Sequence, residues 1–369
     1  DASRIDLGLL RHEYALPARL LGIGLGLTIA AGAALAAVVF GALTVPEAVV
    51  LSVLLAPTDA ALGQAVVTDA RLPSRIRQGL NVESGLNDGL CVPLLFIALA
   101  VAETDAGETG ARHAAFLVVE EVGIGAVGGI AAGLIGAFIA IWGARRGSIE
   151  PDWLQVVPLA SAALAYGVAT PLDGSGFIAA FVGGAVYGGV VRSAEGAQFY
   201  LVDQAGEVLN SITFLLFGAL LLAPALDHLS WRMVVYALGS LTLVRMVPVA
   251  LTLLGTGARW PTVAFLGWFG PRGLASIVFA VIVVEESKLP HADTILVATF
   301  VTVGMSVFLH GVTASPLTNR YVSWMQSVRR PTASLMEDAP TGDQPWRHGR
   351  GLRGAPTGTP AVQEAHSDV

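Results

Sequence analysis

Long apolar stretches separated by short polar connections make up most of this chain of 369 residues. Apolar windows of about 20 residues predict membrane-spanning helices, because that length crosses the hydrocarbon core of a bilayer. We predict ten spans. They cover residues 20–42, 47–68, 78–102, 114–142, 153–172, 176–192, 204–225, 231–254, 260–284 and 292–314. The pattern therefore predicts an all-α membrane protein, a polytopic helical bundle whose environment is the lipid bilayer.

The two ends of the chain are more polar than the rest. Residues 1–19 run from a polar stretch directly into the first span, and the first residue is not Met, so we expect a truncated chain with a cytoplasmic N-terminal segment. Residues 20–314 form the membrane domain, which we expect to be partial. From about residue 326 the apolar periodicity is lost, and we predict that residues 315–369 form a cytoplasmic, disordered tail.

The basic residues predict the orientation. If the chain starts inside, most arginines fall on the cytoplasmic side, as the positive-inside rule requires. Examples are Arg19, Arg75, Arg145, Arg259 and the arginines after the last span, whereas Arg112, Arg232 and Lys288 fall outside. The C-terminus is then cytoplasmic, and the Arg-rich composition favours a bacterial plasma membrane.

Composition excludes several classes of protein. Charged residues make up 13% of the chain and apolar residues 54%, whereas soluble domains carry about 25% charged residues. The single cysteine, Cys91, excludes an internal disulfide framework and a cysteine zinc site. The sequence has no zinc-protease, serine-hydrolase or phosphate-loop motif, and we expect neither a bound cofactor nor a nucleic-acid partner.

Two spans carry helix breakers near their middle. The second contains Pro57 and the ninth contains Pro271, and each proline removes an N–H group and opens the helix locally. The odd offset between these spans makes them run in opposite directions, which an inverted repeat requires. Asp59 and Arg272 lie at the two breaks with opposite charge. We therefore predict inverted repeats with two discontinuous, crossed helices; the plainer alternative is two independent proline kinks.

The third span carries two more carboxylates, which are costly inside a bilayer. Ser84 and Asp88 are four residues apart and share a face, whereas Glu83 and Asn87 share another, roughly 140° away from that of Asp88. We expect Asp88 to face an ion cavity and Glu83 to pair with Arg272. For Glu83 a purely structural ion pair is the competing interpretation.

A carboxylate in a partly dry cavity can hold a proton or a small cation, but not both. Such competition is enough to couple cation flux to proton flux in opposite directions. Hard monovalent cations prefer oxygen ligands. Asp88, Ser84 and Thr58 supply them as a predicted Na⁺ site, with Asp59 and Asn87 nearby.

Other polar or small residues within spans have plainer interpretations. We expect Arg245 in the eighth span to be structural, Cys91 to pack, and His310 near the end of the last span to pack or cap. Gly85 and Gly89 would permit close helix approach.

Four motifs carry a resemblance to a known family. They are Ala-Pro-Thr-Asp at 56–59, Glu-Ser-Gly-Leu-Asn-Asp-Gly at 83–89, Gly-Phe-Ile-Ala-Ala-Phe-Val-Gly-Gly at 176–184, and Gly-Pro-Arg-Gly-Leu-Ala-Ser at 270–276. With these motifs the chain resembles the sodium/proton exchanger family, the NhaP-like bacterial antiporters and their animal relatives. They occur in the family's order and are distributed over most of the membrane part.

The resemblance implies a thirteen-helix fold with a core domain and a dimerisation domain, and a homodimer in the full-length form. The ten spans would be the family's fourth to thirteenth. Asp88 would carry the proton or cation. Thr58, Asp59, Ser84 and Asn87 would line the site, Glu83 would pair with Arg272, and Asn87 in place of a second acid would indicate electroneutral exchange.

Two departures from the family pattern affect the site. The family's first three helices are expected to be absent from this sequence, and Asp1-Ala2 resembles the remnant of a motif at the end of the third, so Asp1 is a possible structural contributor. Ala60 replaces a proline that often follows the Thr-Asp pair, which would make that break milder.

The function predicted from the sequence is exchange of a monovalent cation for H⁺ by alternating access. The cation is expected to be Na⁺, with K⁺ and Li⁺ as alternatives. A cation channel using the same acids, an intramembrane aspartyl protease using Asp59 and Asp88, and an inert fragment are the competing hypotheses.

Overall fold

The computed structural model describes residues 15–59, 61–103, 108–192, 200–286 and 288–328. Within these residues all regular structure is helical. The first half contains α2 (Ala15–Arg19), a π-helical turn (Leu20–Gly24), α3 (Leu25–Phe40), α4 (Val45–Leu54), α5 (Gln64–Val67), α6 (Ser74–Glu103), α7 (Glu108–Arg146), α8 (Pro151–Leu154), α9 (Val157–Ala169), a 3₁₀ turn (Thr170–Leu172) and α10 (Gly176–Arg192).

The second half is also helical throughout its described residues. It contains α11 (Tyr200–Leu216), a π-helical turn (Phe217–Leu222), α12 (Ala223–Asp227), α13 (Trp231–Leu241), α14 (Leu243–Thr252), α15 (Trp260–Trp268), α16 (Leu274–Glu286) and α17 (Ala292–Val328).

Each predicted span coincides with one helix or with two or three consecutive helical elements, so the predicted fold class is confirmed. Seven helical stretches among the described residues are long and apolar enough to cross a membrane. The shorter apolar helices α4, α10 and α16 match the second, sixth and ninth predicted spans.

Both ends of the predicted membrane domain need correction. The first described helix, α2, covers Ala15–Arg19, ahead of the predicted start at residue 20, and residues 1–14 lie outside the described part. The last helix continues to Val328, so residues 315–328, predicted as disordered tail, are helical. Tyr321 and Met325 lie on one face, four residues apart, and pack into an apolar cluster with residues of α5 and α15. Residues 329–369 lie outside the described part.

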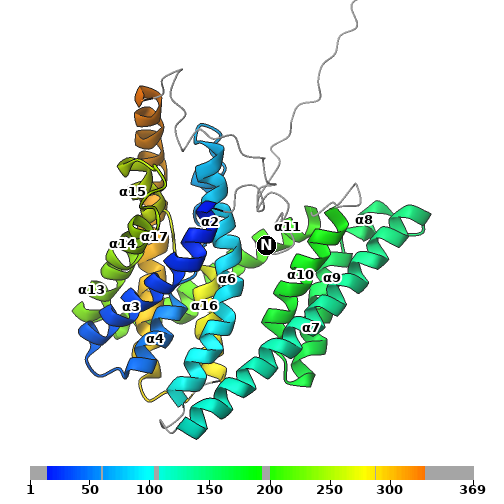
Figure 1. Ribbon diagram of the computed structural model, residues 1–369, viewed down its shortest axis with the longest axis horizontal. Coiled ribbons are helices and arrows are strands. Elements are labelled where there is room, and N and C mark those ends of the chain that lie inside the picture. Colours follow the sequence, from blue (N-terminus) through cyan, green and yellow to red (C-terminus); the bar gives the residue numbers. More distant parts are fainter. Residues whose placement is uncertain (1–14, 60, 104–107, 193–199, 287, 329–369) are drawn as a thin grey trace, which may run out of the picture.

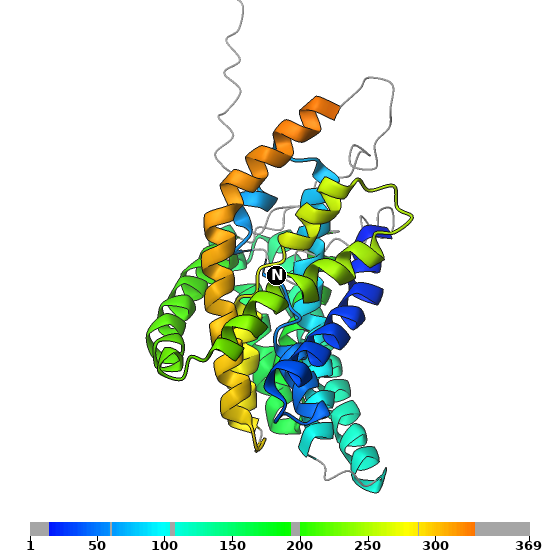
Figure 2. The same cartoon turned by 90° about the vertical axis from the view of Figure 1, so that its left-hand side faces the viewer.

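The helices form two groups with α6 between them (Figure 1). One group consists of α7 to α10, which pack closely on one another. The other contains α3, α4 and α13 to α17, and Figure 2 shows α17 running along its whole height. Because α6 contacts α4 on one side and α7 and α10 on the other, it connects the two groups.

Both predicted helix interruptions are present. The second span is split into α4, irregular segments at 55–59 and 61–63, and α5, whereas the ninth is split into α15, a segment at 269–273, and α16. A proline disfavours helical geometry at the residue before it and lacks the backbone N–H that a helix needs as a hydrogen-bond donor. Pro57 and Pro271 therefore account for where α4 and α15 stop.

Candidate cation and proton site

The two interruptions meet. The backbone N–H of Asp59 in the first break donates a hydrogen bond of 2.7 Å to the carbonyl oxygen of Pro271 in the second. Opened backbone is tolerated at membrane depth only where protein or a cavity surrounds it. Here each break supplies a partner for the other.

Asp59 lies at the start of the helix that follows the opposite break. Its carboxylate accepts a hydrogen bond of 3.0 Å from the N–H of Leu274, the first residue of α16, and one of 2.8 Å from the N–H of Ala61. Asp59 is only 5% exposed. The N-terminus of a helix carries partial positive charge, so the carboxylate is stabilised there.

Arg272 of the second break places a positive charge at the helix end that precedes the first break. Its Nη1 donates to the carbonyl oxygens of Ala56 at 2.6 Å and Pro57 at 3.4 Å, just beyond the C-terminal end of α4. Arg272 is fully buried. Since the C-terminal end of a helix carries partial negative charge, the two breaks stabilise each other's helix ends with opposite charges.

Two glycines of the second break make this arrangement possible. A Cβ atom on Gly273 would overlap the carboxylate of Asp59, and one on Gly270 would overlap the guanidinium of Arg245. The Gly-Pro-Arg-Gly motif thus combines one helix breaker, one cation and two positions where a side chain has no room.

The predicted ion pair between Glu83 and Arg272 is wrong. Glu83 instead forms a bidentate salt bridge with Arg245 of α14, with Nη1–Oε1 at 2.5 Å and Nη2–Oε2 at 2.8 Å. Both side chains are buried. The physical reason is that Arg272 is directed to the backbone carbonyls of the first break, whereas α14 places Arg245 opposite α6. The structural role predicted for Arg245 is therefore the role of Glu83's partner.

Three of the predicted site residues come together around Thr58. The Ser84 hydroxyl donates to the Thr58 carbonyl oxygen at 2.8 Å, and Asn87 Nδ2 donates to the Thr58 hydroxyl at 2.7 Å. All three are buried. The oxygen Oδ1 of Asn87 is also buried and accepts no hydrogen bond from the described residues. Ser84 and Asn87, three residues apart, thus share a face, which the four-residue pairing did not predict.

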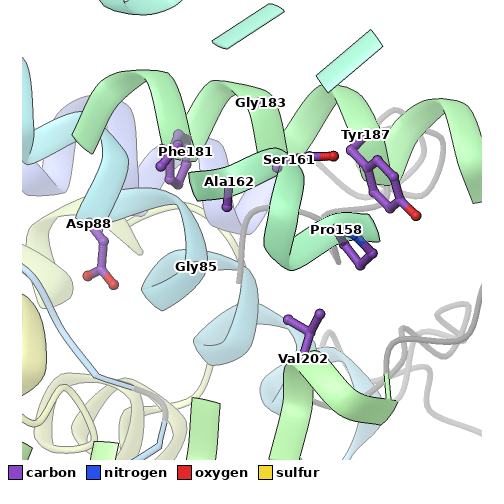
Figure 3. A pocket seen from close by; sticks show the side chains of 11 residues that line it. Gly85, Asp88, Pro158, Ser161, Ala162, Phe181, Gly183, Tyr187 and Val202 are labelled. Atoms are coloured by element: carbon purple, nitrogen blue, oxygen red, sulfur yellow. The ribbon is translucent and has the colours of Figure 1, made fainter. Parts of the chain in front are cut away.

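Asp88 follows Asn87 on α6 and lines a cavity of about 230 Å³. The cavity lies between α6, α9, α10 and the start of α11 (Figure 3). Phe181 and Asp88 lie toward one end, and Tyr187 and Val202 toward the other. Asp88 as a whole is half-buried, its Oδ1 is buried, and it follows Asn87, which holds Thr58.

The glycines beside Asp88 differ from each other. A Cβ atom on Gly89 would overlap the ring of Phe181, so glycine is needed there for α6 and α10 to approach. Gly85 has no atom near that position and lines the cavity instead. The close approach expected for both is therefore found only at Gly89.

Comparison with known proteins decides the family. The family described as "Sodium/hydrogen exchanger, transmembrane" matches residues 2–320. The chain belongs to the sodium/hydrogen exchanger family.

Individual relatives of this exchanger-family chain are distant. It is 30% identical over 288 residues to the Na(+)/H(+) antiporter NhaP of Pseudomonas aeruginosa, covering 72% of this chain and 64% of the relative. It is 24% identical to the K(+)/H(+) antiporter NhaP2 of Shewanella oneidensis and 23% to a probable Na(+)/H(+) antiporter of Schizosaccharomyces pombe. The alignments cover 72% and 66% of this chain and 46% and 34% of those relatives, so the chain spans a third to two-thirds of their length.

The exchanger fold is supported by a solved structure. The sodium proton antiporter MjNhaP1 from Methanocaldococcus jannaschii, at pH 8, superimposes with a TM-score of 0.71 over 87% of this chain and 82% of its own, at 21% identity. At that identity the likeness establishes the fold.

Two further residues complete the account of the exchanger's site. Asp1 lies outside the described residues. Ser306 of α17 was missed, because a serine within a span carries no signal of its own; its hydroxyl accepts a hydrogen bond of 2.7 Å from the N–H of Arg272.

Proposed function

We propose that this chain forms the exchange unit of a secondary transporter that moves a monovalent cation against H⁺. The observation that carries the proposal is the assembly of Thr58, Ser84 and Asn87 beside Asp88, a residue that lines a cavity. Buried oxygens next to an acid at a cavity suit a small cation that competes with a proton.

In this mechanism Asp88 binds either H⁺ or the cation. With the cation bound, the carboxylate supplies the charge, and oxygens of Thr58, Ser84 and Asn87 replace water ligands. With H⁺ bound, the carboxylate is neutral and the cation has left. Asp59 fixes the position of Thr58 through the start of α16, which gives Asp59 a supporting role.

Electroneutral exchange follows if Asp88 is the single titrating acid of the site. The neighbouring position is Asn87, which cannot bind a second proton. Each cycle then carries one cation in one direction and one proton in the other. We take Na⁺ as the cation, with K⁺ and Li⁺ as alternatives, because the relatives are named as both Na(+)/H(+) and K(+)/H(+) antiporters.

The setting of this transporter is inferred from charge and family. We place it in a bacterial plasma membrane with the C-terminus in the cytoplasm, because most arginines fall on that side of the predicted spans. The full-length form is proposed to be a homodimer.

The test is proton movement in liposomes containing the purified protein. Adding Na⁺, K⁺ or Li⁺ to vesicles with an imposed pH gradient should dissipate the gradient, at a rate that saturates with cation concentration and does not depend on membrane potential. Asp88→Asn, which keeps the shape and removes the charge, should abolish this exchange while the variant stays folded and inserted.

Other outcomes would favour other functions. Unsaturable cation flux without proton movement would indicate a channel. Wild-type exchange in Asp88→Asn would reject Asp88 as the carrier. A protease using Asp59 and Asp88 is disfavoured, because the Asp59 carboxylate accepts hydrogen bonds from the backbone of Ala61 and Leu274.

A further inference from the structure

His310 lies on α17 directly behind the second break. The side chain is buried, and its Nε2 is 2.9 Å from the carbonyl oxygen of Trp268, the last residue of α15. A carbonyl oxygen can only accept, so Nε2 carries a proton and donates it. The rings of His310 and Trp268 also lie close, with centroids 5.1 Å apart. His310 thus holds the end of α15 by its backbone.

The other ring nitrogen reaches the opposite side of the same break. His310 Nδ1 is 2.9 Å from the carbonyl oxygen of Ser306 and 3.2 Å from its hydroxyl oxygen, and that hydroxyl oxygen accepts the N–H of Arg272 at 2.7 Å. In the neutral imidazole Nδ1 can accept the serine hydroxyl proton, and in the imidazolium form Nδ1 donates to the Ser306 carbonyl oxygen, so Ser306 is the partner in both forms. One hydrogen-bonded chain therefore runs from Arg272 through Ser306 and His310 to Trp268.

Only a few residues connect this series of hydrogen bonds to the proposed ion site. Arg272 adjoins Gly273 and the start of α16, where the N–H of Leu274 binds the Asp59 carboxylate. Asp59 follows Thr58, whose hydroxyl and carbonyl are held by α6. A change in the width of the second break would move the start of α16 and, with it, Asp59 and Thr58.

We infer that His310 is a positioning residue that fixes the width of the break at 269–273 by joining Trp268 to Arg272. It does not contact the transported ion. It acts on cation binding by keeping α16 and Asp59 in place. This effect on transport rests on the proposed exchange function, whereas the effect on the backbone of the break does not.

The chain offers a matched control on the same helix. Thr313 lies one turn beyond His310, and its hydroxyl accepts a hydrogen bond of 2.9 Å from the indole N–H of Trp268. Thr313→Val removes a bond to the same tryptophan but leaves the backbone of the break untouched. His310→Leu removes both bonds of the imidazole at similar volume, and His310→Gln keeps one donor and one acceptor without a titrating group.

The first measurement is amide hydrogen exchange of the purified protein. In His310→Leu the amides of Gly270 and Arg272 should exchange at least about tenfold faster than in wild type, because the break opens locally. Thr313→Val should leave them unchanged, and His310→Gln should restore protection. Equal protection in wild type and His310→Leu would overturn the inference, as would equal loss in His310→Leu and Thr313→Val.

The second measurement is cation-dependent proton movement in liposomes. His310→Leu should raise the KM for the cation about fivefold or more, with little change in maximal rate, as expected for one lost hydrogen bond acting on binding. His310→Gln should keep the wild-type KM and pH profile. If Gln behaves as Leu does in both measurements, hydrogen bonding is not the cause and the inference is wrong. If wild type shows no exchange, the proposed function fails, and hydrogen exchange still decides the role of His310.

Discussion

The two interrupted helices have similar breakers but different surroundings. The break at 55–59 lies against α6, where Ser84 and Asn87 bind Thr58 next to Asp88 and its cavity. Its backbone and side-chain oxygens lie beside Asp88, the acidic residue among the described residues that line this cavity. This break is the one suited to binding an ion.

Every residue of the break at 269–273 is buried. Arg245 of α14 lies against Gly270, and Ser306 and His310 of α17 hold its two ends. Arg272 is fully buried and directed to the carbonyls of the other break. The second break is therefore a scaffold, and the comparison teaches that crossed helices need not contribute equally: one presents ligands while the other fixes them.

The largest effect on this division should come from Glu83→Gln. The substitution leaves the Arg245 guanidinium buried without its counter-charge, and breaking such a pair costs about 3–5 kcal/mol of unfolding free energy. Because Arg245 adjoins Gly270, the scaffold break should loosen as well. Unfolding of the purified protein in detergent, followed by temperature or denaturant, measures the loss.

The control for this prediction removes both charges. Glu83→Leu combined with Arg245→Leu should recover much of the lost stability, since apolar replacement of a buried pair is often neutral. If Glu83→Gln melts at the wild-type temperature, the pair does not connect α6 to the scaffold as described.

A smaller effect is expected from Gly273→Ala, which tests the crossed charges. The added methyl group would overlap the Asp59 carboxylate, so the carboxylate or the start of α16 must shift. Overpacking of this kind costs about 1–3 kcal/mol. The shift should also weaken the hydrogen bond from the Leu274 amide to Asp59, which faster hydrogen exchange at that amide would report.

Gly26→Ala on α3 is the matched control for crowding. No atom lies near the position of its added methyl group, so alanine should only improve helix propensity, by up to about 1 kcal/mol. If both alanine variants change stability in the same direction and amount, Asp59 does not depend on the room that Gly273 leaves.

How far the sequence predicts this arrangement depends on where the information lies. Pro57 and Pro271 are local signals, so both breaks could be predicted, as could the opposite charges of Asp59 and Arg272. Which carbonyls Arg272 binds depends on how the breaks cross, and a single sequence does not state that. Glu83 was therefore assigned to the wrong arginine.

The end of α17 shows the same limit. The apolar pattern predicts that the last span ends at residue 314, yet the helix continues to Val328. Its continuation is stabilised by packing of Tyr321 against Phe265 of α15, with ring centroids 4.4 Å apart, and by a hydrogen bond to Thr262. Such contacts between distant segments override local propensity and could not be read from one sequence.

The smallest effect should come from Asp69→Asn, which contrasts an exposed pair with the buried one. Just after α5, Asp69 Oδ2 is 2.6 Å from Arg71 Nη2, but the arginine side chain is 57% exposed. Hydrogen bonds from Arg71 hold the pKa of Asp69 below its ordinary value of 3.8. A carboxyl group whose pKa is lowered by folding stabilises the protein at pH values above its ordinary pKa, and this contribution is lost as the pH falls through the lowered pKa.

Because solvent screens exposed pairs, Asp69→Asn should change the melting temperature at neutral pH by no more than repeat measurements vary, and not at all well below pH 3.8. A loss at neutral pH as large as that of Glu83→Gln would show that burial is not what distinguishes the two pairs.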